Sequence, residues 1–157
     1  MRKRIFSLVP TTSSLPDPDW LDLERVAQVE VTSEDSAHPI ESALVPGAGS
    51  GWRATEPGPQ TIRLLFDTPQ GLRRIWLLFI EPDVARTQEF VLSWSPDNGR
   101  SFKEIVRQQW NFSDPGAIQE VEDYQVDLSG VTQLDLTIVP DQRGGDVRAS
   151  LARWRLA

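Results

Sequence analysis

The 157-residue sequence contains no cysteine, one methionine and one histidine. The absence of cysteine excludes a disulfide framework and thiol catalysis, and a zinc site would lack its usual sulfur ligands. A chain without cysteine suits a reducing compartment, although it also suits the periplasm. The basic start is followed only by Ile5 to Val9 before Pro10, which is shorter than a secretory signal needs, so we expect a cytoplasmic protein. The single histidine, His38, would need unusual partners to form a catalytic triad of nucleophile, general base and orienting residue. We expect it to have a structural role.

Long hydrophobic runs and an excess of basic residues are also missing. The longest apolar run, Ile75 to Ile80, is far shorter than the about 20 residues that cross a bilayer. Acidic residues outnumber basic ones by 23 to 16, and the formal net charge of -7 disfavours general binding to phosphate backbones or anionic lipid. We therefore expect neither a membrane nor a nucleic acid as a partner.

Catalytic signatures are absent as well. The sequence has no nucleophile elbow, phosphate-binding loop or dinucleotide fingerprint, and the glycine-rich segment 47–51 precedes no helix that would complete an anion site. Adjacent acidic residues, such as Glu122 and Asp123, point to opposite faces of a strand and do not form a shared site. We expect no catalytic residues and no cofactor, and hence a protein that is not an enzyme.

Short segments of alternating polarity dominate the rest of the sequence and predict half-buried strands. Their apolar positions are Ile62, Leu64 and Phe66; Phe90, Leu92 and Trp94; Tyr124, Val126 and Leu128; and Leu134, Leu136 and Ile138. Segment 75–80 is apolar on both faces, which predicts a central strand covered on each side. No apolar 3.6-residue period continues far enough for a long helix. The class is therefore all-β, with about nine short strands.

The first 19 residues differ from the rest in composition. Segment 10–19 combines Pro, Ser, Thr and Asp with almost nothing to bury, which predicts an N-terminal lead-in over residues 1–19 and one domain over residues 20–157. The apolar residues of segment 5–9 leave open whether the lead-in is a loose arm or an ordered edge strand.

Three stretches carry a family resemblance. Gly51-Trp52-Arg53-Ala54 precedes a strand, segment 90–102 contains the turn Ser95-Pro96-Asp97-Asn98-Gly99 followed by an aromatic residue, and segments 136–140 and 149–152 look like closing strands. Together they resemble the galactose-binding-like superfamily, which includes discoidin-like domains and many carbohydrate-binding modules. The resemblance spans roughly residues 20–157. It implies a jelly-roll β-sandwich of about eight or nine antiparallel strands, with ligands on loops at one end.

The sequence departs from the resemblance at a metal site. Members of the superfamily with structural calcium commonly carry an Asp before the Trp and a Glu in the last strand. Here the loop 43–50 has no carboxylate, and the last strand offers Arg153 and Arg155. Because calcium takes about six or more oxygen ligands, normally with carboxylates among them, we expect no metal.

Six residues are candidates for ligand contact, because sugars present an apolar C–H face and a rim of hydroxyls to aromatic and planar polar side chains. They are Trp52, Arg53, Arg86, Gln88, Trp110 and Asn111. Core packing is the competing interpretation of Trp52 and Trp110. Trp76 and Trp94 lie in such apolar surroundings that we expect them in the core.

These observations predict a non-catalytic binding module that holds carbohydrate through loops at one end of the sandwich. The alternative is a protein–protein interaction or oligomerisation module with no small-molecule ligand, for which the Arg-rich C-terminal segment 148–155 would provide a docking surface. A sugar binder should present a concave loop pocket, whereas an interaction module should expose a flat apolar patch of roughly several hundred Å². An enzyme should show clustered carboxylates with shifted pKa values.

Overall fold

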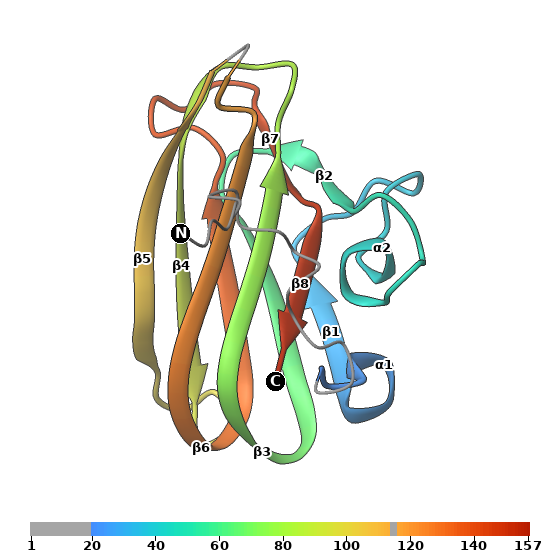
Figure 1. Ribbon diagram of the computed structural model, residues 1–157, viewed down its shortest axis with the longest axis vertical. Coiled ribbons are helices and arrows are strands. Elements are labelled where there is room, and N and C mark those ends of the chain that lie inside the picture. The colour runs from blue at the N-terminus through green and yellow to red at the C-terminus, as the bar shows by residue number, and fades with distance from the viewer. Residues whose placement is uncertain (1–19, 114–115) are drawn as a thin grey trace, which may run out of the picture.

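The computed structural model describes residues 20–113 and 116–157 (Figure 1). The lead-in predicted over residues 1–19 lies outside the described residues. The helices and strands are α1 (Leu23–Val26), β1 (Ala27–Val31), α2 (Glu41–Leu44), β2 (Trp52–Pro57), β3 (Gln60–Ile80), β4 (Arg86–Ser95), β5 (Lys103–Phe112), β6 (Gln119–Val139), β7 (Arg148–Leu151) and β8 (Arg153–Leu156). Neither helix in these ranges has the length and apolar character needed to cross a membrane.

The fold is built around a long antiparallel ribbon of β3 and β6. The two strands pair from Gln60 with Ile138 to Ile80 with Gln119, and the register shifts between Leu65 and Arg74. Figure 1 shows both strands doubling back at the bottom of the view, so that the two halves of the ribbon form facing layers. A long antiparallel ribbon that folds over itself is the topology of a jelly roll. The predicted all-β class is confirmed.

The remaining strands extend the two layers. The first half of β3 pairs with β1, and the second half pairs with β8. The second half of β6 pairs with β4, which pairs in turn with β5. A separate two-stranded sheet of β2 and β7 closes one end. The sandwich therefore rests mainly on pairings between strands that are far apart in the sequence.

The core lies between the layers, where the predicted alternation places it. Ile62, Leu64 and Leu136 are fully buried. The predicted central segment 75–80 runs along β6, and its first four residues also pair with β8. Residues 75–79 are buried, which confirms the central position, whereas Ile80, the last residue of β3, is exposed. Of the two tryptophans expected in the core, Trp94 is half-buried against it. Trp76 is buried but does not belong to the interior cluster.

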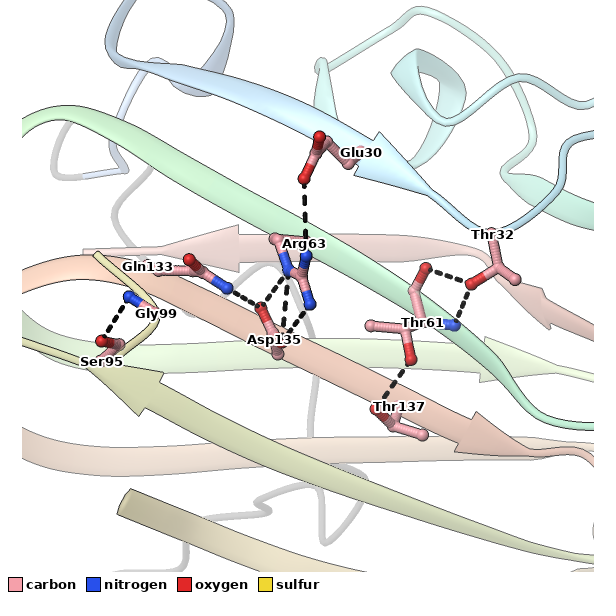
Figure 2. A network of polar contacts seen from close by, with 9 residues as sticks. All are labelled: Glu30, Thr32, Thr61, Arg63, Ser95, Gly99, Gln133, Asp135 and Thr137. Carbon is pink, nitrogen blue, oxygen red and sulfur yellow. Dashed lines mark hydrogen bonds and ion pairs between the residues drawn. The ribbon is translucent and has the colours of Figure 1, made fainter. Parts of the chain in front are cut away.

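Polar side chains cover the outer face of the layer that contains β1, the first half of β3 and the second half of β6. Arg63 pairs with Asp135 at 3.2 Å and with Glu30 at 3.6 Å, and the hydroxyls of Thr61 and Thr137 are 3.0 Å apart (Figure 2). These residues alternate along the strands with inward-facing Ile and Leu. The Arg63–Glu30 pair is exposed and contributes little to stability, whereas the Asp135 side chain is only 14% exposed.

The turn between β4 and β5 has the predicted chemistry. Asn98 and Gly99 adopt left-handed φ values of 60° and 88°, and the Ser95 hydroxyl accepts a hydrogen bond from the Gly99 amide at 2.8 Å. The Asp97 carboxylate accepts hydrogen bonds from the hydroxyl and amide of Ser101, and these bonds, with one from Ser95, lower its pKa to about 2. The hairpin predicted at segment 95–99 is confirmed.

The folded ribbon decides where the loops gather. Because β3 and β6 both double back, all four of their termini lie at the same end of the sandwich (Figure 1). Loops 32–40, 81–85 and 140–147 lie at this end with β2 and β7, and we call it the loop end. The bends of β3 and β6 and the β4–β5 turn lie at the opposite end, where the Asn98 amide donates to the Thr132 hydroxyl at 2.9 Å.

Candidate functional site

Three arginines from different strands converge at the loop end. Arg53 of β2 pairs with Ser150 of β7, and Arg148 lies two residues before Ser150 on the same strand, beyond a register shift. Arg86, at the start of β4, donates from Nη1 to the backbone oxygen of Arg148 at 2.9 Å. The nearby positive charge of Arg53 also contributes to lowering the pKa of Arg86. Three guanidinium groups thus lie close together at the loop end, among acidic residues of the neighbouring loops such as Glu81 and Asp141.

Beneath this surface, Arg86 forms a buried ion pair with Glu81. The two side chains are 2% and 3% exposed, and Nη1 of Arg86 lies 3.3 Å from Oε2 of Glu81. The other Glu81 oxygen accepts the amides of Asp83 and Val84 at 3.0 and 3.1 Å, so loop 81–85 wraps around the carboxylate. Burial lowers the pKa of Arg86, and the charge of Glu81 opposes this shift. Arg86 therefore anchors the loop from below.

Loop 32–40 is tied to Arg53 by its backbone. The Asp35 amide donates to the Arg53 carbonyl at 2.8 Å, and the Arg53 amide donates to the His38 carbonyl at 3.1 Å. Within the loop, the Asp35 carboxylate accepts the Ala37 amide at 2.9 Å and lies 3.7 Å from Nδ1 of His38. The pKa of Asp35 is lowered first by the Ala37 amide and then by the charges of His38 and Arg148.

The surface of the loop end consequently presents four planar polar groups. Arg53 is half-buried, Arg148 is exposed, and the side chains of Asp35 and His38 are 31% and 42% exposed. Guanidinium and imidazole groups donate hydrogen bonds and a carboxylate accepts them, which matches the mixed donors and acceptors of sugar hydroxyls. We call these four residues the loop-end cluster.

The structure separates the six residues that the sequence proposed for ligand contact. It brings Arg53 and Arg86 together at the loop end but buries Arg86. Trp52 is 1% exposed and donates from Nε1 to the Ser33 carbonyl at 3.1 Å. It therefore packs in the core, which the sequence analysis gave as the alternative to ligand contact. The remaining three lie on β4 and β5: Gln88 is buried, Trp110 is half-buried opposite it, and Asn111 is exposed and accepts a hydrogen bond from Thr87.

Sequence reasoning missed three members of the loop-end cluster. Asp35, His38 and Arg148 come from two segments far apart in the chain, and no local motif marks any of them as a binding residue. His38, expected to be structural, lies at the surface of this cluster. Within the described ranges, no group of three or more His, Asp or Glu side chains could hold a metal ion.

A second polar cluster lies inside the sandwich. Glu120 of β6 is opposite the core residue Phe79, is fully buried, and accepts a hydrogen bond from Gln88 at 3.3 Å. Burial raises the pKa of Glu120 to about 9, and a hydrogen bond and negative charge from Glu122 add to the shift. A raised carboxyl pKa is a property of catalytic acids. This carboxyl, however, has no exposed surface from which to meet a substrate.

The pKa of Glu120 predicts a pH-dependent stability. The unfolded chain loses this proton near pH 4.5, whereas the folded protein holds it up to about pH 9, so the folded state loses stability as pH rises between these values. We expect Glu120→Gln, which mimics the protonated carboxyl, to be more stable than the parent protein at pH 8 and to lose this advantage towards pH 4.5. Urea unfolding across this range measures the effect. A difference that stays constant with pH would contradict the assignment.

Comparison by sequence finds no matching family model and no matching curated protein. Comparison by structure finds similar folds. A family 32 carbohydrate-binding module of AlyQ, in complex with 4,5-unsaturated mannuronic acid, has a TM-score of 0.61 and 15% identity, over 84% of this chain and 95% of that one. The family 32 module of NanJ from C. perfringens, in complex with galactose, has a TM-score of 0.59 and 12% identity, over 83% and 92%.

A third similar structure is a family 32 module from a family 31 glycoside hydrolase of Clostridium perfringens, with a TM-score of 0.61 and 18% identity, over 87% of this chain and 93% of that one. At these identities the likeness shows the fold alone. It confirms the jelly roll implied by the resemblance to the galactose-binding-like superfamily.

Proposed function

We propose that this domain is a non-catalytic carbohydrate-binding module that holds sugar at the loop end. The observation that carries the proposal is the loop-end cluster, in which Arg53, Arg148, His38 and Asp35 meet at the surface. The cluster lies on a fold similar to modules solved with galactose, with GalNAc-β-1,3-galactose and with an unsaturated mannuronic acid.

The backbone that carries the cluster is held in place before any ligand arrives. Arg53 is fixed by hydrogen bonds of its own backbone to Asp35 and His38. The buried Glu81–Arg86 pair supports the neighbouring loop and strand from below. A surface whose backbone is already ordered loses less conformational entropy on binding, which favours recognition of small, hydroxyl-rich ligands.

The alternative interaction module is less well supported. Among the described residues, the large hydrophobic side chains that are exposed are Ile80, Val84 and Phe102. Ile80 and Val84 lie at the loop end, whereas Phe102 follows the β4–β5 turn at the opposite end. These side chains do not gather into the single flat patch that a protein-docking surface requires.

A glycan array, followed by calorimetric titration of the strongest hit, tests the proposal. We expect Arg53→Gln and Arg148→Gln each to weaken sugar affinity about tenfold or more, because each variant loses a charged hydrogen-bond donor. Arg100→Gln is the matched control, since it makes the same charge change in the exposed β4–β5 turn.

The results separate the two functions. Binding that is lost in both loop-end variants and kept in Arg100→Gln supports a sugar site at the loop end. Binding that is unchanged in both loop-end variants, or a broad array without any hit, contradicts it and puts the interaction module first.

A further inference from the structure

A pocket of about 870 Å³ lies away from the loop-end cluster, on the outer face of the layer formed by β8 and the second half of β3. One wall is segment 20–24, which leads into α1, and the other is α2 with segment 45–49. We call it the outer pocket. Its volume lies within the range of about 300 to 1,000 Å³ that small-molecule sites occupy.

The strand register places two arginines on the floor of this pocket. Trp76 of β3 pairs with Arg155 of β8, and Leu78 pairs with Arg153. Since paired side chains share a face, and since Ile75 and Leu77 face the core, both arginines lie on the outer face beside Trp76.

The two arginines have different roles. Arg155 donates to the Ala43 carbonyl at 2.7 Å and so ties α2 to β8. Arg153 is exposed, and over residues 20–113 and 116–157 its guanidinium has neither a hydrogen bond nor an ion pair. Arg155 therefore shapes the pocket, and Arg153 leaves its donors available to a ligand.

Trp20 supplies a flat apolar surface at the wall formed by segment 20–24. Its ring lies 5.5 Å from the guanidinium of Arg74, which Asp123 holds with two hydrogen bonds of 2.9 and 2.6 Å. The next residue, Leu21, donates its amide to the Leu156 carbonyl at 2.7 Å. The indole is thus held in place by β3, β6 and β8.

We propose that the outer pocket binds a small organic carboxylate with a flat apolar ring face, in which Arg153 receives the carboxylate and Trp20 receives the ring. A planar guanidinium pairs with a carboxylate through two parallel hydrogen bonds. Asp22 and Glu24 line the same wall as Trp20 and disfavour ligands of higher negative charge, such as phosphate esters. This site does not depend on sugar binding at the loop end.

Two ligand sources share this chemistry, a uronic acid and an aromatic acid. Ligand-detected NMR and calorimetry on the full chain, with galacturonate, phenylacetate and neutral galactose as probes, distinguish them. We expect at least one carboxylate to bind, with affinity about tenfold or more weaker in Arg153→Gln and partly restored in Arg153→Lys. Because Arg153 is exposed, neither variant should alter folding. Trp20→Phe, which keeps an aromatic face, should retain binding better than Trp20→Ala.

Arg100→Gln is the control and should leave the binding of both acids unchanged. Arg53→Gln should leave the binding of phenylacetate unchanged, since this acid has no sugar hydroxyls for the loop end to recognise. The proposal is overturned if neither acid binds at concentrations of a few millimolar, or if Arg153→Gln binds as the parent does. It is also overturned if only Arg53→Gln loses the carboxylate, since that places the ligand at the loop end. Loss of sugar binding in Arg53→Gln alone tests the proposed function separately.

Discussion

Replacing Glu81 with Leu is expected to lower the free energy of unfolding by about 3 to 5 kcal/mol. The substitution leaves the Arg86 guanidinium charged at a site that is 2% exposed, without its compensating carboxylate. It also removes the acceptor of the Asp83 and Val84 amides, so loop 81–85 loses its attachment. A buried charge without its partner costs far more than the pair itself contributes.

Urea unfolding followed by circular dichroism measures this loss, and Glu104→Leu is the matched control. Glu104 pairs with Arg107 at 2.9 Å, but the two side chains are 51% and 57% exposed. The same substitution there should cost about 1 kcal/mol or less. The double variant Glu81→Leu/Arg86→Met should recover much of the lost stability, because it removes the unpaired charge. Equal losses in the two single variants would show that the Glu81–Arg86 pair is not effectively buried.

Trp52→Ala is expected to destabilise the fold by about 3 to 5 kcal/mol, as large-to-small substitutions of buried aromatic residues do. The indole is 1% exposed and is among the largest fully buried side chains of the core. Its Nε1 also donates to the Ser33 carbonyl in loop 32–40, so the substitution removes one support of the loop that carries Asp35 and His38. Thermal and urea unfolding measure the effect.

Trp52→Phe separates packing from ligand contact. It keeps an aromatic ring in the core but loses the hydrogen bond to Ser33, and we expect a cost of roughly 1 to 2 kcal/mol. Sugar affinity of the folded variant should match that of the parent, because Trp52 does not reach the surface. A large loss of sugar affinity at nearly unchanged stability would instead make Trp52 a ligand contact.

The local elements of this protein could be predicted from the sequence because they depend on short-range chemistry. The alternation of Ile62, Leu64 and Phe66 assigns one face of β3 to the core, whatever that strand pairs with. The turn at segment 95–99 follows from residues that tolerate left-handed backbone and cap it with their side chains. The same reasoning found the central position of segment 75–80. The cytoplasmic location remains a prediction.

The candidate site could not be predicted in the same way. Arg53 was proposed from its neighbour Trp52, but alternation along β2 turns that tryptophan into the core and leaves the arginine half-buried at the surface. Asp35 and His38 meet Arg148 only because β2 pairs with β7. Sequence spacing carries no information on such long-range pairing, since many pairings satisfy the same alternation.

The all-β class, the strand faces and the β4–β5 turn follow from the sequence alone, because the backbone and side chains of a few neighbouring residues decide these features. The doubling back of β3 and β6, which brings their ends together, became visible in the three-dimensional fold. That folding selected the loop end, buried Arg86 against Glu81, and left Trp76 and Arg153 on an outer face. These features arise from contacts between distant segments, and the burial of the whole core, not any local pattern, determines which of those contacts form.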